Sequence, residues 1–234
     1  MTSDDTLQSL RLRGNQLIPL PLTLTLLSKL SDLQVQYNPM KDLDTNILMN
    51  VSSNLKKLSF GSINMTKWPT SVMGLNKLVE LSVYNVSMDS FPVNAFEGLE
   101  DSLMFLQIES TNISRLPVSI NKLSKVGDFS NLALLITLEL SFYPISMVEL
   151  EAFATTQSLQ VLHLRYTKLR TVPEAIKKIR LYSIDLTGSN VICTCVGFGW
   201  MKQWPTRKST FISGKCTNLN IPIYEFQMKY IPKC

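Results

Sequence analysis

The chain has 234 residues, of which 45% are hydrophobic and 18% are charged, so it holds enough apolar material for a sizeable core. No segment approaches the roughly 18 uninterrupted apolar residues that a membrane-spanning helix requires. The formal net charge is +5, and all of it falls after residue 192, where six basic residues face one acidic residue. The first five residues are polar and acidic, which is not the pattern of a signal peptide.

A leucine pattern, L-x-x-L-x-L-x-x-N-x-L with substitutions, recurs along the first 192 residues. Its eight copies begin at Leu7, Leu30, Leu55, Leu78, Leu103, Leu135, Leu159 and Leu181, at intervals of 23, 25, 23, 25, 32, 24 and 22 residues. Apolar residues alternate within each copy, as in a short strand with one buried face. One such strand cannot bury its apolar face alone, whereas stacked copies form a parallel sheet over a continuous core.

The ninth position of the pattern is a turn position, where asparagine normally caps backbone groups inside the stack. Only Asn15 and Asn38 follow this rule. The remaining copies have Ile63, Val86, Thr111, Tyr143, Thr167 and Ser189, so we expect irregular turns there. Residues 68–78 and 172–181, which lead back to the next copy, are expected to contain a short helical turn.

The interval between Leu103 and Leu135 carries roughly eight extra residues around Lys122–Asn131. This insertion forms either a loop on the convex side or a loop that overhangs a ligand, because insertions in repeat proteins often lie on the binding face.

The last copy runs directly into a cysteine-rich segment, "SNVICTCVGFGWMKQW", and the four cysteines of the chain are Cys193, Cys195, Cys216 and Cys234. Four cysteines permit three disulfide pairings. A zinc site and free buried thiols are alternatives, although the C-x2-C spacing that structural zinc favours is missing. Trp200 and Trp204 are four residues apart, so we expect them to share one face of a short helix that ends at Pro205 and to cover the open end of the core.

The repeats and the C-x-C…C…C spacing together resemble extracellular leucine-rich-repeat proteins that end in a cysteine-rich C-terminal flanking cap (LRRCT). This group includes Toll-type receptor ectodomains, Slit-like and Nogo-receptor-like neuronal proteins, and variable lymphocyte receptors. The resemblance implies an α/β solenoid, a horseshoe with a parallel β-sheet on the concave face and an irregular or short helical convex side. It divides the chain into repeats over residues 1–192 and a cap over residues 193–234, and it implies the disulfides Cys193–Cys216 and Cys195–Cys234.

An extracellular location, secreted or as the ectodomain of a membrane protein, follows from this resemblance and from disulfides, which persist in oxidising compartments. No cysteine-rich cap precedes Leu7, so the first copy would expose its apolar edge. We therefore expect the parent protein to continue upstream, with any membrane anchor outside these 234 residues.

Four N-x-S/T sequons, at Asn50, Asn64, Asn85 and Asn112, are candidates for N-glycosylation. Asn64 and Asn112 occupy the same slot of different copies, and Asn85 lies two slots earlier. These three are expected to line a similar lateral edge, which a glycan would keep out of a tight protein interface.

Residues that flank the strand leucines point out of the concave face, where aromatic and arginine side chains are typical of binding hot spots. The resemblance implies that this face binds a protein ligand in an immune, adhesion or guidance receptor. The candidate ligand-binding residues are Tyr84, Phe105, Glu109, Glu139, Phe142, His163, Arg165 and Tyr166. Packing of Phe105 and Phe142 against their neighbours along the sheet is an equal alternative.

Two other functions stay open. The basic cap, with Lys202, Arg207, Lys208 and Lys215, could bind a glycosaminoglycan or another polyanion. The chain could instead be an intracellular scaffold with reduced cysteines. We expect no enzyme, metal, cofactor or nucleic-acid partner, because His163 is the only histidine and no nucleophile–base set, metal cluster or phosphate loop accompanies it.

Overall fold

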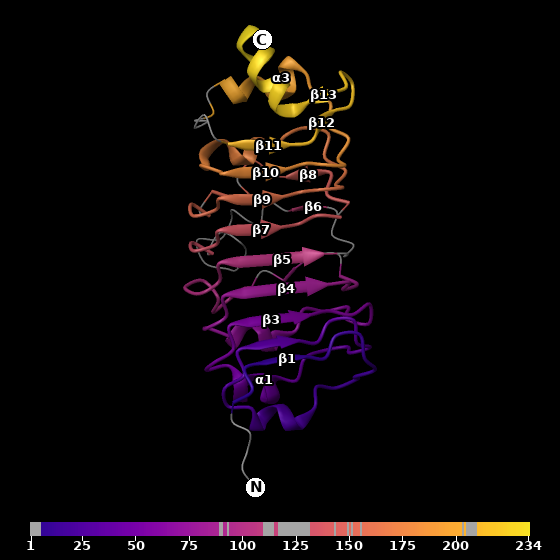
Figure 1. Cartoon of the computed structure of the whole chain (residues 1–234), viewed down its shortest axis with the longest axis vertical. Coiled ribbons are helices and arrows are strands. Elements are labelled where there is room, and N and C mark those ends of the chain that lie inside the picture. The colour runs from indigo at the N-terminus through magenta and orange to yellow at the C-terminus, as the bar shows by residue number, and fades with distance from the viewer. Residues whose placement is uncertain are drawn as a thin grey trace.

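Short parallel strands are stacked along one side of the molecule, as the computed structural model of the chain shows (Figure 1). The structure describes residues 6–88, 91–92, 94–109, 132–142, 144–148, 150, 152–154, 156–202, 204 and 210–234, and the backbone of residues 115–116. The predicted insertion around Lys122–Asn131 lies outside the described residues, as do Asn112, Arg207 and Lys208.

A nine-stranded parallel sheet forms the concave face, and eight of its strands come from the eight leucine copies. In sheet order the strands are β1 (Ser9–Arg11), β2 (Asp32–Gln34), β3 (Lys57–Phe60), β4 (Glu80–Tyr84), β5 (Phe105–Glu109), β7 (Thr137–Glu139), β9 (Val161–His163), β10 (Ser183–Asp185) and β11 (Phe211–Ser213). Neighbouring copies pair without slippage, so that Leu10 lies opposite Leu33 and Leu33 opposite Leu58. This confirms the predicted α/β solenoid with a parallel sheet.

The leucine positions of the pattern build the core. From the second copy onward, the side chains at the first, fourth and sixth positions are all buried. Each such side chain contributes about 1.5–3 kcal/mol when it leaves water, and every copy gains this only by stacking on its neighbours. In the first copy Leu7 is exposed and Leu10 and Leu12 are only partly buried, because no strand lies beyond β1 among the described residues.

The turns after the strands are more regular than the missing asparagines predict. Of the seven copies whose residue before the turn position is described, six have a positive φ there, namely Gly14, Tyr37, Asn85, Phe142, Tyr166 and Gly188. The third copy differs, because there Gly61 takes the positive φ one position earlier. Consequently Ser62 is buried and Ile63 is exposed, so assigning Ile63 to the inward turn position is wrong.

Hydroxyl groups replace the asparagine amide in the last two copies. Asn38 donates from Nδ2 to the carbonyl oxygen of the sixth position in its own copy (2.9 Å) and in the preceding copy (2.8 Å). Thr167 donates to Leu164 of its own copy (3.0 Å), and Ser189 donates to the same oxygen from the following copy (3.1 Å). Threonine and serine therefore satisfy the inner carbonyls that asparagine normally satisfies.

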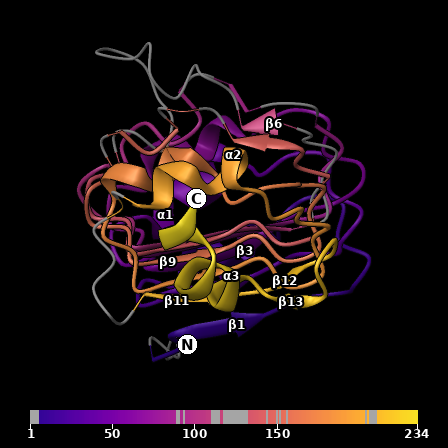
Figure 2. The same cartoon turned by 90° about the horizontal axis from the view of Figure 1, so that it is seen from above.

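The segments that return to the next strand lie on the opposite side from the sheet (Figure 2). They contain the 3-10 helices η1 (Leu22–Leu26), η2 (Thr70–Gly74) and η5 (Glu174–Lys178), and the α-helix α1 (Thr45–Val51). The second and third of these 3-10 helices fall where helical turns are expected. Asp44 caps the N-terminus of the α-helix, since its carboxylate accepts from the Ile47 amide at 3.0 Å. Strands β6 (Arg115–Leu116) and β8 (Met147–Val148) form a separate parallel pair.

The cap closes the C-terminal end of the stack (Figures 1 and 2). It contains α2 (Cys195–Phe198), the 3-10 helix η6 (Gly199–Lys202), the antiparallel strands β12 (Lys215–Cys216) and β13 (Ile221–Pro222), α3 (Ile223–Lys229) and the 3-10 helix η7 (Ile231–Lys233). The cap also supplies β11, the ninth strand of the main sheet, which pairs with β10. The sheet therefore continues past the predicted boundary at residue 193.

The two tryptophans of the cap pack on the core, but not from one helix. The α-helix α2 ends at Phe198, so Trp200 lies in η6 and Trp204 follows it. Trp204 is buried and donates from Nε1 to the carbonyl of Ile179 at 3.3 Å. The ring centroids of Trp200 and Trp204 are 5.6 Å apart.

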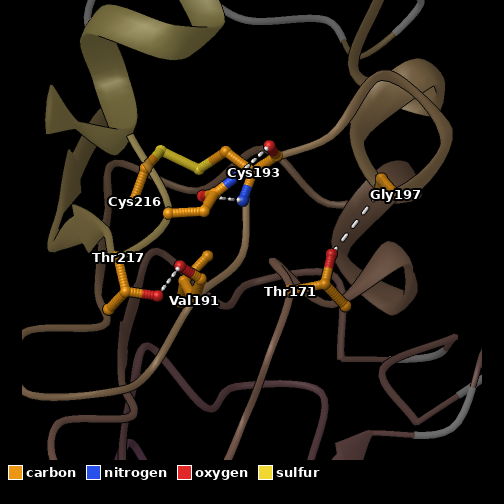
Figure 3. The surroundings of a disulfide bond; sticks show 7 residues. Thr171, Val191, Cys193, Gly197, Cys216 and Thr217 are labelled. Atoms are coloured by element: carbon orange, nitrogen blue, oxygen red, sulfur yellow. Dashed lines mark hydrogen bonds between the residues drawn. A yellow bond between two sulfur atoms is a disulfide. The ribbon is translucent and has the colours of Figure 1, made fainter. Parts of the chain in front are cut away.

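Two disulfides, Cys193–Cys216 and Cys195–Cys234, use all four cysteines, in the pairing that the resemblance implies. Each sulfur atom is thus bonded to one other sulfur atom, which leaves none to bind zinc. Around Cys193–Cys216 the hydroxyl of Thr217 donates to the carbonyl of Val191 at 2.9 Å (Figure 3). Among the described helices, none has the length and apolar character to span a lipid bilayer.

Candidate functional site

The outward side chains of the concave face form rows that run across the strands, because alternate residues of a strand point away from the core. Strand register aligns these rows. The first row in the C-terminal half of the sheet holds Phe105, Thr137, Val161, Ser183 and Phe211. The second row holds Gln107, Glu139, His163, Asp185 and Ser213. Apolar or small side chains therefore lie beside a polar row.

Glu139 is the centre of a polar network in the second row. Its side chain is only 9% exposed, although it lies on the outward side of β7. Oε2 lies 2.8 Å from Nδ1 of His163 and accepts from Nη2 of Arg165 at 3.1 Å. Oε1 accepts from the backbone amide of Ser141 at 2.9 Å. An ionised carboxylate only accepts hydrogen bonds, so Nδ1 of His163 carries the hydrogen.

Arg165 is fixed from several sides and still reaches solvent. Its Nε donates to Oγ of Ser141 at 3.2 Å, and the same nitrogen lies 3.9 Å from the Asp185 carboxylate. The Arg165 side chain nevertheless remains 40% exposed. A guanidinium held in place in this way loses little conformational entropy when a ligand binds to its free donors.

The contacts of Arg165 also decide whether Ser141 and His163 are arranged as a nucleophile and its base. Arg165 donates to the Ser141 hydroxyl from both its backbone amide and its side chain. Within the described residues, Ser141 and His163 share no hydrogen bond. The hydroxyl of Ser141 is therefore not placed as a nucleophile beside His163 as its base, even though Glu139 contacts the histidine as the third member of such a set would.

Aromatic side chains stand where the strands end. Phe142 and Tyr166 stack with ring centroids 4.9 Å apart and ring planes 10° apart. Both remain more than half exposed, at 51% and 56%. Tyr166 also lies against Gly188, where an added Cβ would come within 2.4 Å of its ring. The glycine thus leaves room for the tyrosine ring, and the pair offers an exposed apolar surface beside the Glu139 network.

A second aromatic pair lies towards the N-terminus. Tyr37 and Tyr84 have ring centroids 5.6 Å apart, and the Arg13 guanidinium lies 4.9 Å from the Tyr37 centroid. The Tyr84 hydroxyl donates to Oε1 of Gln107 at 3.0 Å, and Nε2 of Gln107 donates to Glu109 at 3.2 Å. Burial raises the pKa of Tyr84 and of Tyr37, so both phenols keep their proton at neutral pH.

The structure thus brings the predicted ligand-binding residues together in two clusters on one face. Glu139, Phe142, His163, Arg165 and Tyr166 form one cluster. Tyr84 and Glu109 meet through Gln107, and Phe105 lies apart in the first row. Sequence reasoning missed Tyr37, Ser141 and Phe211. Tyr37 and Phe142 are both the eighth residue of their leucine copies, so a comparison of the eighth residues could have identified Tyr37. Phe211 belongs to no leucine copy, so the pattern gives no signal for it.

The predicted glycan sites lie in different places, and Asn85 adjoins the second cluster, because it directly follows Tyr84 and donates its backbone amide to the Glu109 carbonyl at 2.9 Å. Asn50 is exposed at the end of α1, on the return side of the stack. Asn64 is exposed in the turn after β3 and donates from Nδ2 to the carbonyl of Pro39 at 3.1 Å. Asn85 is half-buried in the turn after β4. In the cap, Lys202 and Lys215 are exposed on η6 and β12.

No protein-family model matches this sequence, and no curated protein is similar to it. Among solved structures, the chain is similar to a leucine-rich-repeat protein of Leptospira interrogans, with a TM-score of 0.67 and 21% identity over 90% of this chain and 50% of that one. It is also similar to internalin C2 of Listeria monocytogenes, with a TM-score of 0.57 and 22% identity over 78% of this chain and 72% of that one. This chain has the leucine-rich-repeat fold. It spans about half the length of the Leptospira protein. The finer resemblance to the Toll-type and Slit-like group stays a prediction.

Proposed function

We propose that this leucine-rich-repeat chain is an extracellular recognition domain that binds a protein ligand through the C-terminal half of its concave face. The observation that carries the proposal is the pairing of a fixed, partly exposed Arg165 with the exposed Phe142–Tyr166 stack: Arg165 directly precedes Tyr166, and its backbone carbonyl accepts from the Phe142 amide at 2.7 Å. Arginine and aromatic side chains dominate binding hot spots, particularly where neighbouring groups already hold them in position.

The size of the sheet favours a protein over a small molecule. Nine strands about 4.8 Å apart give a face about 38 Å long. Most of these strands are three residues long, so a ligand centred on the C-terminal half would also cover the turns that flank the strands to reach the roughly 800 Å² that each partner contributes to a standard protein interface. The ligand would therefore extend over several strands, with the Phe142–Tyr166 stack near the centre of its footprint.

The disulfides support the extracellular location and oppose the intracellular scaffold. Cys193–Cys216 and Cys195–Cys234 leave no free thiol, and such bonds persist in oxidising compartments. A cap closed by disulfides also supports the proposed kinship with immune, adhesion or guidance receptors. Glycans on Asn50, Asn64 and Asn85 would agree with this location, and a loss of mass after treatment with a glycosidase would detect them.

Capture of ligands by a secreted fusion of the chain tests the proposal. Three versions are compared: the unchanged chain, Phe142→Ala with Tyr166→Ala, and a control, Ile63→Ala with Leu150→Ala. The control residues are similarly exposed, at 66% and 59%, but do not belong to the concave rows. Proteins captured from the extracellular fraction of the source tissue are purified and measured again by biolayer interferometry.

We expect the Phe142 and Tyr166 replacements together to weaken binding by roughly 30-fold or more, because one hot-spot residue contributes about 2 kcal/mol or more and the contributions of stacked neighbours do not add in full. The control should bind like the unchanged chain. Equal binding by all three versions, or the absence of any captured protein, would refute the proposed function.

A further inference from the structure

The cap presents a surface that neither the core nor the concave face uses. Val196 on α2 is 96% exposed and Met228 on α3 is 71% exposed, which is unusual for large apolar side chains. Tyr224 and Tyr230 are also exposed. Both helices lie at the C-terminal end of the solenoid (Figures 1 and 2). We call this surface, with Val196, Tyr224, Met228 and Tyr230, the cap end.

The structure ties the parts of the cap end together. Tyr224 and Met228 are four residues apart on α3 and therefore share one face of that helix. Met228 also lines a pocket of about 370 Å³ with Met201, Lys202, Gln227, Ile231 and Pro232. The Cys195–Cys234 disulfide joins the residue beside Val196 to the end of η7. The exposed apolar groups thus stand on elements that are packed or covalently linked to one another.

The charges of the cap are almost all positive. Lys202, Lys215 and Lys233 are exposed, and no ion pair is recorded for them among the described residues. Glu225, the one acidic residue after Cys193, pairs with Lys229 at 2.8 Å. Whatever binds the cap end must therefore offer both an apolar region for the exposed side chains and negative charge for the lysines.

We propose that the cap end docks on the surface of an anionic lipid bilayer, with its apolar side chains among the acyl chains and its lysines at the headgroups. Interfacial segments combine these two kinds of side chain, and each lysine near an anionic surface strengthens binding. A sulfated glycan has no acyl region, so it would account for the lysines and leave Val196 and Met228 unexplained. The solenoid would then stand on the membrane by its cap, with the concave face free.

Vesicle sedimentation of the oxidised 234-residue chain tests this inference. The vesicles are phosphatidylcholine alone, or phosphatidylcholine with a minority of phosphatidylserine. One test variant carries Val196→Ser with Met228→Ser, and its control carries Ile63→Ser with Leu150→Ser. The other test variant carries Lys202→Glu with Lys233→Glu, and its control carries Lys56→Glu with Lys67→Glu at exposed positions in the N-terminal half.

We expect salt-sensitive binding to the vesicles that contain phosphatidylserine, and weaker binding to phosphatidylcholine alone. The lysine reversal should weaken binding by at least roughly tenfold, and the apolar replacement by roughly tenfold. Both controls should bind like the unchanged chain. These results are independent of whether the concave face binds a protein.

Three results would overturn the proposal. The first is no sedimentation with phosphatidylserine vesicles even at low salt. The second is equal loss of binding in the test variants and their controls. The third is a loss on lysine reversal alone, with retention on heparin that depends on the same lysines, which would assign the cap to polyanions instead.

Discussion

Replacing Gly61 with alanine should destabilise the protein strongly and disturb the candidate site. Gly61 is buried at φ +138°, and an added Cβ would lie 1.7 Å from the carbonyl oxygen of Tyr84 and 2.6 Å from its nitrogen. The backbone conformation costs a non-glycine residue about 1–3 kcal/mol. Moving the end of β4 away from the new methyl group adds about 1–3 kcal/mol.

The expected loss is therefore about 2–6 kcal/mol, a large part of the roughly 5–15 kcal/mol by which domains are stable. Gly14→Ala is the matched control, since Gly14 has φ +68° and nothing within 4 Å of the added Cβ. It should cost only about 1–2 kcal/mol. Urea unfolding followed by tryptophan fluorescence measures both variants, and similar unfolding free energies would refute the clash at Tyr84.

Three further predictions concern the turn, the phenols and the cap. Asn38→Ala should lower the unfolding free energy by about 3 kcal/mol, because three hydrogen bonds are lost, whereas Asn15→Ala at an exposed turn should change it by less than about 1 kcal/mol; urea titration compares them. Burial raises the pKa of Tyr84 above its usual 10.0, so the unfolded chain releases that proton first and stability should fall as the pH rises past 10.0. Tyr84→Phe should flatten this fall in urea midpoints between about pH 9 and about pH 11, and an unchanged slope would contradict the assignment. Replacing Cys195 and Cys234 together by serine opens a loop of 39 residues and should cost about 4 kcal/mol, measured as a lower unfolding temperature with the other disulfide intact.

The strand register was predictable from the sequence, and the C-terminal end of the sheet was not. A leucine pattern repeated at nearly constant intervals specifies which residues face the core, because a shift by one residue would turn every leucine to solvent. The strand Phe211–Ser213 has no such pattern, and it joins the sheet because the cap holds it beside β10. The leucine pattern also failed to predict that Ile63 is exposed. The positive φ of Gly61 shifts the turn by one residue, and this shift leaves the leucine spacing unchanged.

The membership of the candidate site was largely predictable, whereas its chemistry was not. Alternation along a strand is enough to place Glu139 and His163 in one outward row. The burial of Glu139 depends on Arg165, which reaches back to the neighbouring strand β7 from the turn after β9 in the next copy. Such a contact depends on side-chain conformation between distant residues, and local pattern carries no signal for it.

The ninth strand, β11, makes the two ends of the solenoid unequal in stability. Each copy contacts only its neighbours, so unfolding begins at an end. At one end, β1 has a single neighbour within the described residues, and Leu7 before it is exposed. At the other end β11 belongs to a segment closed by two disulfides. Backbone amides should therefore exchange with solvent first near β1 and last near β9 and β10, so the residues around Glu139 outlast the copies that precede them.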